Sequence, residues 1–195
     1  MSAEPPLPPA GYQPAMRFEY PRLLLQVLGL VMFVVSIGVF LMAAWLLNGR
    51  PAGLPISFGT SIWEFLLMIL MVFVTVVIHE LIHGAAYQLL GYKVSYGLHP
   101  QMVAAYAAAF KQYQKRNHNI WVALAPVVVL TIVCTPLMGV PIEWVKTAAF
   151  TLLIVNTSGS VGDFYLTWYL SRLPQNALIY DQSLEDMFVF LPDGF

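Results

Sequence analysis

Four apolar runs, separated by short polar stretches, account for most of the chain. They cover residues 23–47, 61–91, 120–138 and 142–170. A membrane-spanning helix needs about 20 mostly apolar residues, so each run is long enough to cross a bilayer. The pattern therefore predicts about four transmembrane helices, the fourth interrupted by the polar, glycine-containing stretch NTSGSVGD at 156–163.

Several residues indicate where these helices begin, bend and end. Ser61 and Glu64 have the spacing of a capping box at the start of the second run, and Gly91 is a typical helix stop at its end. Pro126 and Pro136 fall inside the third run, where proline kinks a helix. The second helix is longer than one span requires, so we expect its last turns to tilt or to leave the hydrocarbon.

The stretch between the second and third runs is too polar for a fifth span. Gly97 and Pro100 lie in a segment that contains KVSYGLH and MVAAYAA, both with β-branched and aromatic residues. This pattern favours a short β-hairpin over residues 93–110 at the membrane surface, with an irregular interfacial loop as the alternative. The predicted fold class is an all-α membrane protein with about four transmembrane helices and this short hairpin between the second and third.

Composition supports a membrane location. The chain has 195 residues, of which 59% are hydrophobic and only 10% charged, whereas a soluble domain carries about 25% charged residues. The net charge of −1 argues against nucleic acid as a partner. The expected partners are the lipid bilayer and a membrane-protein or peptide substrate, and the oligomeric state stays open.

The distribution of basic residues predicts the orientation, because cytoplasmic loops are enriched in Lys and Arg. With both termini in the cytoplasm, seven basic residues lie inside and two outside. The inside set is Arg17, Arg22, Lys93, Lys111, Lys115, Arg116 and Arg172, and the outside set is Arg50 and Lys146. We expect a multi-pass cell-membrane protein with a disordered proline-rich tail (1–16), an integral membrane domain (17–175) and an acidic cytoplasmic tail (176–195).

Two histidines and a glutamate interrupt the second apolar run, in the sequence HELIH. His79 and His83 are four residues apart, so both imidazoles lie on one helical face and can bind one metal ion. Glu80 can reach a water on that metal, which is the His-Glu-x-x-His arrangement of zinc peptidases. Zinc lowers the pKa of its bound water and Glu80 accepts the proton. The alternative is a polar cluster that serves helix packing or a proton path.

A catalytic zinc ion needs a third protein ligand, and Asp163 is the best acid available. The other acids except Glu80 lie in the tails or near the predicted helix starts. Helix lengths place His79 roughly 26 Å from Ile62, and Asp163 roughly 30 Å from Glu143, at similar depths in the bilayer. The expected cofactor is one zinc ion held by the two histidines and Asp163.

Four other polar residues are weaker candidates. His99 and His118 are rivals for the metal, but both fall in the predicted cytoplasmic loop, where an uncoordinated role is expected. Asn156 and Ser160 bring polar groups to the depth of Asp163 and could bind a ligand or an incoming peptide. Close helix packing is the alternative explanation for the small residues of this stretch.

The HELIH motif, followed by NTSGSVGD in a later span, resembles the intramembrane metalloproteases of the site-2 protease type. Together with HELIHGAAYQLLGYKVSYG and the LAP at the third span, it more closely resembles a bacterial membrane family described as "putative zincin peptidase". The resemblance covers most of the chain from residue 22 to the acidic tail. It implies His79, His83 and Asp163 as zinc ligands, Glu80 as the general base, and a membrane-associated hairpin over residues 93–110.

The leading hypothesis is a zinc-dependent intramembrane endopeptidase that cleaves transmembrane or juxtamembrane segments, with Glu80 activating a zinc-bound water. Such a substrate must unwind, because the carbonyls of a helix are already hydrogen-bonded. One alternative is a metal-binding but non-proteolytic membrane protein, either an inactive homologue or an interaction partner. A small transporter or proton-conducting protein is a third hypothesis, which the lack of an internal repeat disfavours.

Overall fold

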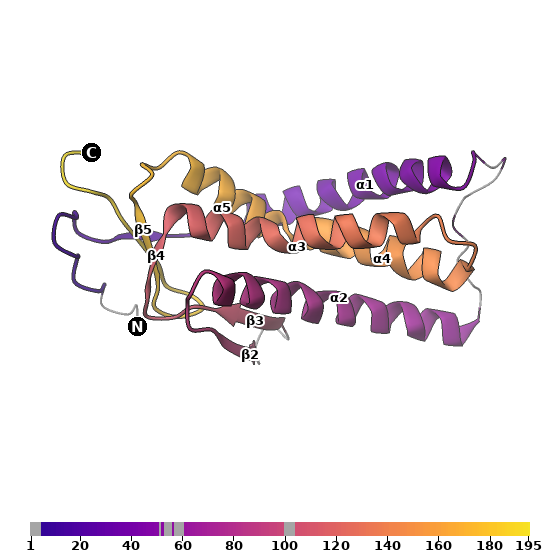
Figure 1. Cartoon of the computed structure of the whole chain (residues 1–195), viewed down its shortest axis with the longest axis horizontal. Coiled ribbons are helices and arrows are strands. Elements are labelled where there is room, and N and C mark those ends of the chain that lie inside the picture. The colour runs from indigo at the N-terminus through magenta and orange to yellow at the C-terminus, as the bar shows by residue number, and fades with distance from the viewer. Residues whose placement is uncertain (1–4, 51, 53–55, 57–60, 100–103) are drawn as a thin grey trace. The chain divides into compact units, whose positions relative to one another are not determined.

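The computed structural model describes residues 5–50, 52, 56, 61–99 and 104–195. In the described parts the elements follow the order shown in Figure 1. The helices are α1 (Arg22–Leu47), α2 (Ile62–Leu89), α3 (Arg116–Leu137), α4 (Glu143–Gly159) and α5 (Val161–Ser171). The strands are β1 (Met16–Phe18), β2 (Ser95–His99), β3 (Ala104–Ala108), β4 (Tyr113–Lys115), β5 (Leu178–Asp181) and β6 (Met187–Phe190).

Three of the described helices, α1, α2 and α3, are long and apolar enough to cross a membrane. They expose large apolar side chains, among them Leu23, Trp63 and Ile132, each more than 65% exposed. Such an apolar surface needs a cover, and a bilayer provides it. The structure therefore supports a membrane location, while the orientation of the termini stays a prediction.

The fourth predicted span is split. α4 ends at Gly159 and α5 begins at Val161, so a break at Ser160 divides the expected run. Ser160 satisfies the end of α4, because its backbone N–H and its hydroxyl both donate to the carbonyl oxygen of Asn156, at 3.0 and 2.7 Å. The sequence signalled an interruption here, but the structure contains two shorter helices rather than one long span.

The ends of α2 are confirmed in detail. The N–H of Ser61 donates to Oε2 of Glu64 at 3.0 Å, and the N–H of Glu64 donates to Oγ of Ser61 at 3.3 Å, which is a capping box. At the other end Gly91 has φ +87, and the N–H of Tyr92 donates to the carbonyl of Tyr87 at 3.0 Å. Glycine adopts this left-handed conformation without steric cost, so the helix stops there.

The fold is mostly helical but not purely all-α. The expected hairpin is present: β2 and β3 pair antiparallel, with Tyr96 opposite Ala107, and residues 100–103 lie outside the described residues. A second, four-stranded antiparallel sheet in the order β1-β6-β5-β4 was not predicted. It joins segments from both ends of the chain, so its strand pairings leave no local sequence signal. The predicted domain boundaries stay a prediction.

The chain divides into two compact units. Unit 1 comprises residues 1–22, 80–125 and 162–195, and unit 2 comprises residues 23–79 and 126–161. Unit 1 contains both sheets and a core built on α5, β1, β5 and β6, with Leu170, Ile179 and Val189 fully buried. In unit 2, Nδ2 of Asn48 at the end of α1 donates to the carbonyl of Met138 just beyond α3, at 2.8 Å.

Candidate functional site

The HELIH motif lies on the continuous helix α2. His79, Glu80 and His83 each offer a ligand atom, and these three atoms lie within 4.8 Å of one another. The helical rise brings residues i and i+4 onto one face, so the spacing read from the sequence produces this cluster without help from other elements. Two imidazole nitrogens and a carboxylate oxygen are a donor set suited to zinc.

Hydrogen bonds at Nδ1 orient both histidine rings. Nδ1 of His83 lies 2.9 Å from the carbonyl oxygen of Val122. Nδ1 of His79 lies 2.9 Å from Oδ1 of Asn156, whose Nδ2 donates to the carbonyl of Pro126 at 3.4 Å. Both partner oxygens can only accept, so each Nδ1 carries the proton. Nε2 is then the ring atom with the lone pair, which is the tautomer that a metal ligand needs.

Glu80 is fixed by the hairpin. Its Oε2 accepts the backbone N–H of Ala107 in β3 at 3.0 Å, within unit 1. A hydrogen bond to an ionised carboxylate is stronger than one between neutral groups. The carboxylate beside the two histidines is therefore held against the edge of β3 that faces away from β2.

Asp163 stands in the first turn of α5, just after the break at Ser160. The break starts a new helix, and Asp163 comes to lie beside His83, with 20% of its side chain exposed. Ser160 is fully buried and bonds to the backbone of Asn156, so in this structure its hydroxyl closes α4. Asn156, by contrast, points its amide at His79.

The distance between Asp163 and His83 allows a test of whether a metal fits. Oδ1 of Asp163 lies 3.5 Å from Nε2 of His83, longer than the roughly 2.7–3.2 Å of a hydrogen bond. Two ligands of one tetrahedral zinc ion, at bond lengths of about 2.0–2.2 Å, lie about 3.4 Å apart. The observed separation therefore suits two atoms that share an ion.

Comparison with known proteins agrees with this geometry. Residues 72–178, which include His79, Glu80, His83, Asn156 and Asp163, match the model of the family described as "Putative zincin peptidase". The chain belongs to this family. The HELIH motif on α2 lies within the matched residues.

One relative and the solved structures complete the comparison. The chain is 25% identical, over 150 residues, to a protein of Pyrococcus woesei named "Uncharacterized 24.7 kDa protein in gap 5′region". The match covers 76% of this chain and 64% of that relative, so the chain spans about two thirds of the relative's length. No solved structure matches the chain.

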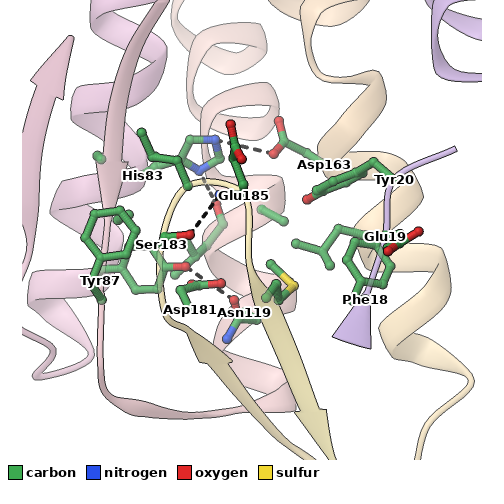
Figure 2. Close-up of a pocket in the computed structure, with 18 of the residues that line it drawn as sticks. Phe18, Glu19, Tyr20, His83, Tyr87, Asn119, Asp163, Asp181, Ser183 and Glu185 are labelled. Carbon is green, nitrogen blue, oxygen red and sulfur yellow. Dashed lines mark hydrogen bonds and ion pairs between the residues drawn. The ribbon is translucent and has the colours of Figure 1, made fainter. Parts of the chain in front are cut away.

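A pocket of about 640 Å³ in unit 1 opens beside this zincin motif. His83 and Asp163 line it, and Figure 2 shows their side chains directed toward one another from α2 and α5. Ala107 and Ala108 of β3 form another part of its wall. The pocket therefore connects the hairpin edge with two of the predicted ligands.

The hairpin rests on the face of α2 that carries Glu80. A Cβ added at Gly84 would overlap the ring of Tyr96, so the aromatic side chain packs directly on the helix backbone at this glycine. Tyr96 is the cross-strand partner of Ala107, whose N–H binds Glu80. One strand pair thus attaches the hairpin to α2 at two points, four residues apart on one helical face.

A buried polar network near the pocket was not predicted. The hydroxyl of Tyr87 donates to Oδ1 of Asn119 at 3.3 Å, and Nδ2 of Asn119 donates to Oε1 of Gln114 at 2.8 Å. Nε2 of Gln114 in turn donates to Oδ2 of Asp181 at 3.0 Å. Burial raises the pKa of Asp181 to about 6, although the bond from Gln114 opposes the shift. The network connects α2, one turn beyond His83, to α3, β4 and β5.

The two remaining histidines occupy other positions. Nδ1 of His118 lies 2.9 Å from the hydroxyl of Tyr92, which itself accepts the N–H of Lys115 at 3.1 Å. His99 lies in β2, with its backbone paired to Ala104.

Proposed function

We propose that the protein is a zinc-dependent intramembrane endopeptidase, similar in mechanism to the site-2 type. His79, His83 and Asp163 are the proposed ligands of one zinc ion, and Glu80 is the general base. The observation that carries the proposal is the orientation of both imidazoles: each Nδ1 faces an oxygen that can only accept, so each Nε2 is the ring nitrogen that carries the lone pair.

When bound, zinc would polarise the scissile carbonyl and lower the pKa of a water molecule. Glu80 accepts a proton from the attacking water as the new C–O bond forms. It then gives that proton to the departing amide nitrogen as the C–N bond breaks. The bond from Ala107 to Oε2 fixes the carboxylate in one orientation beside the two histidines, which is the positioning that such a proton transfer requires.

The substrate binds as an extended strand. β3 pairs with β2 along one edge, and the N–H of Ala107 on its other edge points to Glu80. A peptide that adds to this outer edge presents its carbonyls next to Glu80, and its backbone hydrogen bonds compensate for unwinding. Asn156 supports this chemistry indirectly, by orienting His79 rather than by contacting peptide.

Substitution of the base is the decisive experiment. The Glu80→Gln variant should retain zinc and its fold but lose peptide cleavage in proteoliposomes that contain single-span model peptides. Glu64→Gln is the matched control, since Glu64 lies on the same helix and glutamine preserves a capping box. Cleavage that survives in Glu80→Gln would exclude the endopeptidase and favour a metal-binding, non-proteolytic protein.

A further inference from the structure

The pocket beside the zincin motif belongs entirely to the unit that carries the sheets. Its contributors from α2, α3 and α5 lie near helix ends, and the remaining lining residues come from the hairpin, from residues 17–22 and from residues 181–187. His83 is the first residue of α2 to reach it. Along the helix that residue is about 32 Å from Ile62, and a bilayer's hydrocarbon is about 30 Å thick. The pocket therefore lies at the polar end of this span.

The lining of the pocket is unsuited to a lipid-embedded helix. Charged side chains of Arg17, Arg22, Glu19 and Glu185 contribute to it, together with the buried carboxylate of Asp181. Charged groups are costly in hydrocarbon and persist where water is present. A volume of about 640 Å³ also falls within the range of pockets that enclose small ligands. It is large enough for several side chains of an extended peptide.

Both terminal segments of the chain build one wall of this pocket, and both lie outside the region 72–178 that matches the family. Arg17 of β1 forms an ion pair with Asp186 at 2.8 Å, and Asp186 also bonds Ser183 at 3.1 Å. These contacts hold the turn between β5 and β6. Its tip, Leu184 and Glu185, is exposed and lines the pocket.

We propose that the substrate is an extended, water-accessible peptide segment flanking a membrane span, and that Leu184 and Glu185 select it by contacting its side chains. The proposal rests on the proposed endopeptidase function and narrows its substrate class. The hydrophobic part of a span is excluded, because the pocket surrounds the cleavage site with charged groups. Glu185 favours substrates with a lysine or arginine near the scissile bond, which are frequent where a span meets the cytoplasm.

The first experiment compares two peptides with the zinc-loaded, full-length protein in proteoliposomes. One is a soluble peptide of mixed polar sequence, and the other carries the same sequence next to a 20-residue Leu/Ala span. Mass spectrometry should locate cleavage in the polar sequence of both. Cleavage confined to the Leu/Ala span would overturn the inference and leave the endopeptidase function standing. If neither peptide is cleaved in a Glu80-dependent way, the proposed function itself fails.

The second experiment tests the wall. In the soluble peptide, replacing Lys by Glu near the scissile bond should lower kcat/KM at least tenfold with the wild-type protein. Glu185→Lys should reverse this preference with zinc content unchanged, while Leu184→Ala should broaden the preference for apolar side chains. Asp193→Lys, an exposed acid of the same segment outside the pocket, is the control and should shift the preference less than twofold. If Glu185→Lys and the wild type prefer the same peptide, Glu185 does not select the substrate and this part of the proposal is refuted.

Discussion

Replacing Asn156 with leucine tests the proposed metal centre at a residue that does not bind the metal. Leucine has a similar volume but cannot accept the N–H of Nδ1 of His79, now bonded at 2.9 Å. Asn156 is 2% exposed, so water cannot replace the lost partner easily. The His79 ring would lose the contact that fixes its tautomer and orientation.

The size of the effect follows from the contact. Loss of the hydrogen bond that orients a ligating histidine typically weakens metal binding 10–100-fold, or about 1.4–2.7 kcal/mol. An unpaired buried donor destabilises the fold by a further 1–3 kcal/mol or so. We therefore expect the zinc dissociation constant of Asn156→Leu to rise by one to two orders of magnitude, with a lowered melting temperature in detergent.

Competition with a fluorescent zinc chelator measures the dissociation constant directly. Asn156→Asp keeps the acceptor and should bind zinc at least as tightly as wild type. Ser158→Ala on the same helix removes hydroxyl bonds to the carbonyls of Ile154 at 2.7 Å and Val155 at 3.3 Å, both within α4, so the zinc affinity of this variant should not change. If folded Asn156→Leu binds zinc as tightly as wild type, His79 is not held as a ligand by Asn156 and the reasoning is wrong.

Three further predictions concern residues of unit 1. Asp163→Ala should lower zinc retention and the melting temperature of the zinc-loaded protein, but have little effect once a chelator has removed the metal; full occupancy at limiting zinc would move the third ligand elsewhere. Gly84→Ala should displace the ring of Tyr96 and increase proteolysis of the hairpin, and the second substitution Tyr96→Ala should restore protection. For Asp181, the folded-state pKa of about 6 lies above the ordinary 3.8. Below about pH 4 the carboxyl is protonated in both the folded and the unfolded protein and does not lower the free energy of unfolding. As the pH rises through 6 the buried group ionises, and the free energy of unfolding falls. In metal-free protein, Asp181→Asn should therefore melt like wild type near pH 4 and be more stable than wild type by up to about 3 kcal/mol at pH 7.5. If the variant and the wild type have the same melting temperature at pH 7.5 as well as at pH 4, burial of the Asp181 carboxylate does not destabilise the fold.

The parts of the fold that depend on local sequence were predictable. The capping box of Ser61 and Glu64, and the stop at Gly91, use residues within one or two turns of each helix end. The hairpin β2–β3 is likewise formed from neighbouring segments. Helix-end residues and neighbouring strands can be recognised in a short stretch of sequence, so these elements could be predicted.

The four-stranded sheet depends on distant pairing and could not be predicted in the same way. Met16 pairs with Val189, and β5 contacts a strand more than 60 residues earlier in the chain. The acidic residues near the C-terminus predicted a solvated tail, whereas the structure has the short strands LIYD and MFVF there. A strand of four residues carries little signal unless its partner is known.

The candidate site likewise has parts that depend on local sequence and parts that depend on contacts between distant segments. The motif residues follow from i, i+4 spacing, and Asp163 is the predicted third ligand because Glu80 is the only other acid that the sequence is expected to place at membrane depth. The partners that orient the rings are less visible, because one of them is the backbone carbonyl of Val122. Every residue except proline carries the same N–H and C=O groups, so no side-chain type could have indicated this bond. Of these two partners, Asn156 is the one that bonds its histidine through a side chain. Substitution at Asn156 can therefore remove the group that orients a ligand without removing the ligand itself.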